Sequence, residues 1–148
     1  MVGLVKMIDV SEKKVVPRKA VAEGSIVLKK GTIEAIHEGT VVKGNVLTAA
    51  KLAGIKGVKD TSNLIPLCHP IPVTHASVDL DMKEDRIVCR CEVRADYKTG
   101  VEMEALVGAS IALLTIWDMV KYLEKDERGQ YPHTAITNMR VVRKEKGE

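Results

Sequence analysis

The 148-residue sequence contains no phenylalanine, and aromatic residues make up only 3% of it. Domains that recognise RNA by stacking bases need exposed rings, so this deficit argues against an RNA-binding surface. No run of eighteen or more apolar residues is present, and we therefore expect no membrane-spanning helix. The N-terminal apolar run is too short for a signal peptide and is interrupted by charge at once. Together these absences predict a cytoplasmic protein.

Amide and thiol side chains are scarce too. Only four Asn and Gln residues occur against 29% charged residues, a balance reported for heat-adapted proteins. The three cysteines, Cys68, Cys89 and Cys91, are an odd number without framework spacing, which indicates a reducing compartment. Cys89 and Cys91 could in principle bind zinc together with His69 and His75. Because no Cys-x-x-Cys chelate is present, small buried thiols are the better interpretation, and we expect no metal site.

The length and the apolar content of 45% predict one domain with a proper core. Residues 1–16 lack a clear period and are expected to form an N-terminal arm, followed by a single domain over 17–148. The net charge of +3 is mild and suits a small anionic ligand at least as well as a polyanion. No phosphate-binding GxxxxGK[ST] loop is present, so nothing suggests the use of ATP.

Hydrophobic periodicity predicts four strands and two full helices. The strands are expected over 20–28, 73–80, 86–95 and 133–142, the helices over 45–57 and 99–121, and at most one further helical turn over 32–36. Asn45 is expected to cap the first helix, and Thr99 the second in a capping box with Glu102. The order strand, helix, strand, strand, helix, strand is the ferredoxin-like pattern. We therefore predict an α+β fold in which an antiparallel sheet carries both helices on one face.

The second of these helices is apolar on more than one side. Its main stripe, which should pack on the sheet, comprises Leu106, Ala109, Leu113, Ile116, Val120 and Leu123. Ile111, Leu114 and Trp117 are apolar as well but lie off this stripe. A helix with apolar residues on several sides is covered on several sides. We therefore expect a second subunit as the additional cover, the alternative being a few scattered exposed apolar residues.

The same helix begins with Glu102 and Glu104 and ends with Asp118 and Lys121, and His69 lies between two prolines upstream. Acids, a cation and a histidine on rigid elements are the components of acid–base catalysis. Each also has a simpler explanation: a helix cap for Glu102, a surface ion pair for Asp118, or a backbone contact for His69. The residues alone thus indicate an oligomer with an acid–base site and do not name a substrate.

Helix geometry separates these groups. Glu104 and Asp118 are fourteen residues apart, so they project in similar directions but lie roughly 21 Å apart along the axis. One nucleotide-sized ligand would hardly reach both within one subunit. If both are functional, each site takes them from different subunits, or they contact different ends of an extended ligand. We expect at least one of Lys43 and His69 to share a site with the partner subunit's Asp118 or the partner subunit's Lys121.

Six blocks in the sequence lie in the order and spacing of a known family: MIDVSEKK, VPRKA, KGNVLTAAKLAGI, LIPLCHP, KTGVEMEAL and TIWDMVK. From about residue 8 to residue 140, the chain resembles molybdenum cofactor biosynthesis protein C, the cyclic pyranopterin monophosphate synthase family. The resemblance implies a ferredoxin-like fold assembled as a homo-hexamer, a trimer of dimers, with sites at subunit interfaces. It also implies a lyase that converts the cyclised GTP intermediate 3',8-cyclo-7,8-dihydro-GTP to cyclic pyranopterin monophosphate and releases pyrophosphate.

Matching positions imply the site residues. The catalytic residues by this match are Lys43, Asp118 and Lys121, and the substrate-binding residues are Leu67, Cys68, His69, Glu102, Met103, Glu104, Arg18 and Lys146. Lysines can act as acid and base when burial and neighbouring cations favour the neutral amine. A guanidinium suits the triphosphate, whereas carboxylates can accept from the N–H groups of the purine edge.

The C-terminus departs from the family. A Gly-Gly-Lys-Ser-Gly segment is common there, whereas this chain ends in RKEKGE, so Lys144 or Lys146 could supply the missing lysine. The resemblance implies no cofactor, and the sequence does not decide whether magnesium stimulates the reaction.

Two other classes stay open at this stage. A nucleic-acid-binding ferredoxin-like module would use the row of Arg86, Arg90 and Arg94 on one strand, although exposed rings are absent; a steep salt dependence of affinity would support it. A non-catalytic regulatory oligomer would bind a small ligand without turnover. We expect a nucleotide-derived small molecule as the ligand and neither nucleic acid nor membrane as a partner.

Overall fold

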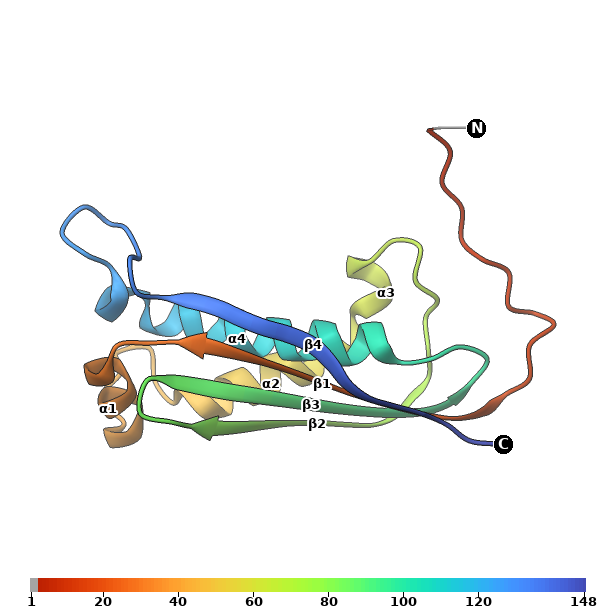
Figure 1. Ribbon diagram of the computed structural model, residues 1–148, viewed down its shortest axis with the longest axis horizontal. Coiled ribbons are helices and arrows are strands. Elements are labelled where there is room, and N and C mark those ends of the chain that lie inside the picture. The colour runs from red at the N-terminus through yellow and green to blue at the C-terminus, as the bar shows by residue number, and fades with distance from the viewer. Residues whose placement is uncertain (1–2) are drawn as a thin grey trace.

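The computed structural model describes residues 3–148, which form a four-stranded sheet with helices packed against it (Figure 1). The strands are β1 (Val16–Val27), β2 (Val73–Met82), β3 (Arg86–Tyr97) and β4 (Ala135–Lys146), and the helices are α1 (Lys30–Glu38), α2 (Val46–Lys59), α3 (Thr61–Leu64) and α4 (Glu102–Glu124). The predicted α+β fold is confirmed.

The strand order in the sheet is β2–β3–β1–β4, and all neighbouring strands are antiparallel. The two long helices, α2 and α4, occupy the two helical positions of the predicted element order. They lie side by side on one face of the sheet (Figure 1), where α4 contacts β1 and β3 and α2 contacts β2. α1 and α3 are additional helices between β1 and β2, so a nine-residue helix replaces the single turn expected there.

β3 alternates as predicted, and its inward face forms the floor of the core. Ile87, Cys89, Cys91 and Val93 are all fully buried. Burial raises the pKa of both thiols to about 12, so they stay protonated at neutral pH. Cys89 and Cys91 are therefore the small buried thiols that the sequence indicated. In residues 3–148 no group of three or more potential metal ligands is found.

The second side of α4 is covered by its own chain. A Cβ added at Gly57 of α2 would lie 2.9 Å from Ile111 Cγ1, which shows how closely the two helices approach. Trp117 is half-buried and packs edge-on against Tyr131, with ring centroids 5.3 Å apart. Of the three off-stripe apolar residues, only Leu114 is mainly exposed, at 53%. The chain's own contacts thus cover Ile111 and Trp117 in part, and the expectation that a second subunit completes the cover stays a prediction.

By length and composition alone, α4 would meet the criteria for a membrane span, but 56% of that stretch is buried inside the fold, as is usual for a core helix.

Several element ends differ from the sequence-based expectation. β1 begins at Val16 rather than at residue 20, and β4 extends to Lys146, because these two ends pair with each other through Arg18 and Lys146. The predicted capping box of Thr99 with Glu102 is wrong. α4 begins at Glu102 after Val101, which makes no side-chain cap. The carboxylate of Glu102 instead pairs with Lys144 of β4, a charge-assisted contact that outcompetes a cap.

A buried carboxylate joins three segments at the C-terminal end of α4. Glu124 is fully buried and accepts hydrogen bonds from the backbone N–H of Lys29 (3.1 Å), from Thr32 Oγ1 and from Thr134 Oγ1 (2.6 Å). Lys29 is the N-cap residue of α1 and has no side-chain cap of its own. A tertiary contact thus satisfies a donor at the start of α1.

We predict that Glu124→Ala strongly destabilises the fold. It would leave two buried hydroxyl donors and one part-buried N–H without an acceptor. At about 1–3 kcal/mol for each buried donor, this lowers Tm by roughly 4 °C or more for a chain of this size. Thermal unfolding followed by circular dichroism measures this effect. Glu127→Ala is the control, because Glu127 is an exposed glutamate in the loop after α4. Equal melting temperatures for the two variants would contradict the assigned role.

Candidate active site

Nine of the eleven implied site residues form two groups at opposite ends of α4. The lysine–aspartate cluster comprises Lys43, Asp118 and Lys121 near the C-terminal end of the helix. The histidine–glutamate cluster near its N-terminal end comprises Leu67, Cys68, His69, Glu102, Met103 and Glu104. At 1.5 Å per residue, Glu104 and Asp118 lie roughly 21 Å apart along the axis.

In the lysine–aspartate cluster, one carboxylate binds two ammonium groups. Lys43 Nζ lies 2.8 Å from Asp118 Oδ2, and Lys121 Nζ lies 3.1 Å from Asp118 Oδ1. Lys43 Nζ also donates to the backbone carbonyl of Asp118 (3.3 Å). The hydrogen bonds from Lys43 and Lys121 hold the pKa of Asp118 below its usual range. Asp118 is therefore ionised at neutral pH and orients both lysines.

Lys43 reaches Asp118 because a short loop joins α1 to α2. Gly39 ends α1 in the left-handed conformation (φ 73°), and Gly44 has a φ of 112° that favours glycine. Asn45 Oδ1 accepts from the N–H of Thr48 (3.0 Å), so the predicted cap of α2 is confirmed. The loop 39–45 is thus fixed at both ends, with Lys43 projecting from its middle.

The contact between Lys43 and Asp118 lies within one chain. We had expected that at least one of Lys43 and His69 would meet the partner subunit's Asp118 or the partner subunit's Lys121. For Lys43 this expectation was wrong, because its ammonium group binds Asp118 of the same chain. His69 belongs to the other cluster, so its pairing across an interface stays a prediction.

His69 is held by the N-terminal arm. Its Nε2 donates to the carbonyl oxygen of Ile8 (2.6 Å), which is the simpler of the two roles considered for this residue. Between the arm and the His69 loop lies a cavity of about 380 Å³. It is lined by Lys6, Ile8, Val10, Lys13, Leu67, Cys68, His69, Ile71, Thr99, Gly100, Glu102 and Met103. The cavity therefore collects five of the eleven implied site residues.

Glu104 is the most unusual group of the histidine–glutamate cluster. Its side chain is only 3% exposed, and its Oε1 has no hydrogen-bond partner among the described residues. Burial raises the pKa of Glu104 to about 7, opposed by a backbone hydrogen bond and supported by the charge of Glu102. At neutral pH this carboxyl can therefore either donate or accept a proton.

The two glutamates have opposite protonation tendencies. Burial alone would raise the pKa of Glu102, but the hydrogen bond from Lys144 and the charges of Lys144 and Arg18 lower it below its usual range. Burial raises the pKa of the Cys68 thiol, and Glu104 and Glu102 raise it further, so Cys68 is not a ready nucleophile. A charged and a partly protonated carboxyl side by side can bind a ligand with both donors and acceptors.

Arg18 forms hydrogen bonds that stabilise the fold. Its guanidinium is buried, and Nε and Nη2 donate to the carbonyl oxygens of Tyr97 and Lys98 (3.3 and 3.1 Å). The Nε and Nη2 donors of Arg18, which we had expected to bind the triphosphate, therefore bind backbone carbonyls instead. Arg18 and Lys146 also line a second cavity of about 450 Å³ at the end of the sheet.

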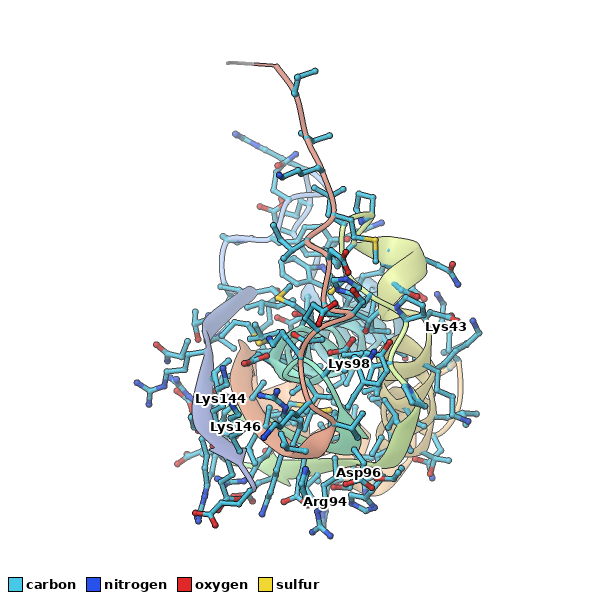
Figure 2. The ribbon with its side chains drawn as sticks, turned by 90° about the vertical axis from the view of Figure 1, so that its right-hand side faces the viewer. Lys43, Arg94, Asp96, Lys98, Lys144 and Lys146 are labelled. Carbon is cyan, nitrogen blue, oxygen red and sulfur yellow. The ribbon has the colours of Figure 1, made fainter. Side chains whose placement is uncertain are left out.

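The C-terminal lysines differ in their surroundings. Lys144 Nζ contacts Glu102 Oε1, whereas Lys146 lies opposite Arg18 in the β1–β4 register. Figure 2, which views the molecule from the end where β4 finishes, shows both lysines on the same strand. Lys144 thus reaches the histidine–glutamate cluster directly, whereas the resemblance left Lys144 and Lys146 open as candidates.

Sequence reasoning missed three cations around the histidine–glutamate cluster. Lys6 and Lys13 line its cavity from the arm, and Lys98 Nζ donates to the carbonyl oxygen of Ser11 (3.5 Å), which ties the arm down (Figure 2). The arm has no hydrophobic periodicity, so the sequence did not predict where it lies. Its only informative feature was the MIDVSEKK block of the family resemblance.

We predict that Glu104→Gln gains stability relative to the wild type as pH rises. The folded pKa of Glu104 lies above its ordinary value of 4.5, at about 7. Wild-type stability is therefore lost between pH 4.5 and about pH 7, because the group ionises in the unfolded chain while it keeps its proton in the folded one. The amide of the variant cannot ionise and escapes this loss, which amounts to roughly 3 kcal/mol at one pKa unit per 1.4 kcal/mol. Melting temperatures at pH 5 and pH 8 measure the difference, and a pH-independent difference would contradict burial of a titrating Glu104.

The chain matches the model of the MoaC family over residues 7–147. It is 60% identical over 144 residues to the "Probable cyclic pyranopterin monophosphate synthase" of Pyrococcus furiosus, covering 97% of this chain and 92% of the relative. The Thermococcus kodakarensis protein of the same name is 62% identical with the same coverage. A Methanothermobacter thermautotrophicus relative, "Probable cyclic pyranopterin monophosphate synthase accessory protein", is 58% identical over 97% of this chain and 91% of its own length. The chain therefore belongs to the MoaC family, as the resemblance predicted.

Proposed function

We propose that this protein is a cyclic pyranopterin monophosphate synthase of molybdenum cofactor biosynthesis. Its substrate would be 3',8-cyclo-7,8-dihydro-GTP, and it would release pyrophosphate. The observation that carries the proposal is the lysine–aspartate cluster, in which Asp118 binds Lys43 and Lys121 at 2.8 and 3.1 Å. The names of two relatives that are 60% and 62% identical to this chain support the same activity.

The chemistry needs proton transfers at several steps. One ring must open, the pyrano ring must close and a cyclic phosphate must form. Asp118 stays ionised and holds two ammonium groups, each of which keeps further protons to donate. A lysine that has given its proton to a leaving group becomes the base for the following step. Cover by a partner subunit would remove water from the cluster and favour the neutral amine in that role.

The histidine–glutamate cluster would recognise the purine-derived part of the substrate. Glu102 is an acceptor, Glu104 with its free Oε1 can accept or donate, and Met103 and Leu67 offer exposed apolar surface beside them. Lys6, Lys13, Lys144 and Lys146 surround this end with positive charge suited to phosphates.

Each cluster is incomplete alone, and they lie roughly 21 Å apart on one helix. We therefore infer that a complete site combines the histidine–glutamate cluster of one subunit with the lysine–aspartate cluster of its partner. A homo-hexamer built as a trimer of dimers would supply such sites. A cytoplasmic location and the lack of a resident cofactor belong to the same proposal.

The nucleic-acid alternative is disfavoured by the open face of the sheet. Arg90 is paired with Glu23, Arg94 with Glu92, and Arg143 with Glu145, so the arginines there alternate with carboxylates. A polyphosphate backbone would need unpaired cations. A regulatory oligomer without turnover stays the second candidate, because one relative carries the word "accessory" in its name.

We predict that Asp118→Asn lowers kcat by at least about 100-fold, the lower range for the loss of acid–base catalysis. The neutral amide no longer holds two ammonium groups in place. The control is Asp60→Asn at the end of α2, which removes a similar aspartate–lysine pair, with Lys56. Pyrophosphate release from the cyclised dihydro-GTP measures the activity. Near-normal turnover by Asp118→Asn would contradict the catalytic role, and no turnover by the wild type would favour the regulatory oligomer.

Subunit mixing tests the shared site. Inactive His69→Ala and Asp118→Ala proteins, unfolded together and refolded, should regain about a quarter of wild-type activity, since in a symmetric interface one pairing in four joins two intact clusters. Lys43→Ala mixed with Asp118→Ala is the matched control and should regain nothing, because both residues belong to one cluster. No recovery in either mixture, with mixed oligomers seen by mass spectrometry, would place the whole site in one subunit.

A further inference from the structure

Two side chains of α4 hold the loop 39–45 that carries Lys43. The first is Asp118, which binds the Lys43 ammonium group. The second is Tyr122, whose Oη accepts from the backbone N–H of Val42 at 2.9 Å. Tyr122 follows Asp118 by four residues, or one helical turn, so both side chains face the same loop.

The position of Lys43 depends on the backbone just before it. The Lys43 side chain is 45% exposed and long, so packing restricts it little along its length. The Val42 side chain is 82% exposed, which leaves its N–H bond to Tyr122 as the tether at this point. Val41 is buried, and its carbonyl accepts from the N–H of Gly44 (3.0 Å), which closes the turn around Lys43.

We propose that Tyr122 is a positioning residue for Lys43. Its hydroxyl group fixes the Val42 backbone, and this keeps the Lys43 ammonium group beside Asp118 and toward the substrate. The inference rests on the proposed function, in which Lys43 is catalytic. Tyr122 itself contacts the loop rather than the reacting atoms.

The test is Tyr122→Phe, which keeps the ring and removes only the hydroxyl group. We expect kcat to fall about fivefold, the factor that one net hydrogen bond provides, while KM stays within about twofold. Hydrogen exchange of a peptide that covers the loop 39–45, followed by mass spectrometry, should become faster while peptides of β1 and β3 keep their rates.

The matched control is Tyr131→Phe. Tyr131 lies in the segment between α4 and β4 and packs edge-on against Trp117. Neither kcat nor loop exchange should change in this variant.

Three results would overturn the inference. Unchanged exchange in the loop would show that the hydrogen bond does not hold it. Faster exchange with unchanged kcat would show that loop order does not matter for catalysis, and a rise in KM at constant kcat would assign Tyr122 to uniform binding. If the wild type has no turnover, the proposed function fails and the catalytic inference fails with it, while the exchange data still report on the hydrogen bond separately.

Discussion

The fold depends on the close contact between α2 and α4. A Cβ added at Gly54 would lie 2.9 Å from the carbonyl oxygen of Gly108, and one added at Gly108 would lie 2.6 Å from Cys91 Sγ. Only glycine fits at these two positions, so α2 can lie directly on α4 while α4 lies directly on β3. This packing brings the start of α2 beside the end of α4, where Lys43 meets Asp118.

Because α4 is packed on two sides, its functional groups are restricted to its ends. Most of the middle of the helix packs against the sheet and α2, with Leu114 as the mainly exposed exception. A rigid helix of this length keeps the two ends at a fixed separation. The division into two clusters is thus a result of the core rather than of the chemistry. At the N-terminal end, Glu104 is buried with an Oε1 that has no hydrogen-bond partner among residues 3–148.

Local patterns predicted the parts of the fold that local interactions decide. The alternation in β3 and the Asn45 cap of α2 could be read directly, because each follows from residues close in sequence. α1 was underestimated because its first donor is satisfied by Glu124, 95 residues away. The capping box failed for a similar reason, since Lys144 attracts the Glu102 carboxylate.

The candidate site was predictable in its residue types but not in its grouping. The family resemblance supplied the residues of both clusters. Helix geometry predicted that Glu104 and Asp118 lie far apart along α4. Neither could show that Lys43 joins Asp118 of its own chain, which depends on the glycine contact between α2 and α4. The arm carried no periodicity at all, so its place over His69 was outside the reach of sequence patterns.

The hydrogen bonds of Glu124 also have a consequence for the synthesis of the chain. Its bonds to Lys29 and Thr32 close loops of 95 and 92 residues, and the contact of Lys43 with Asp118 closes one of 75. Closing loops of this length costs conformational entropy before the contact forms. During synthesis the α1 region would leave the ribosome long before its acceptor exists. The corner of the molecule that holds Lys43 and Lys121 therefore requires all of α4, and a chain that ends before α4 is complete has no means to assemble it.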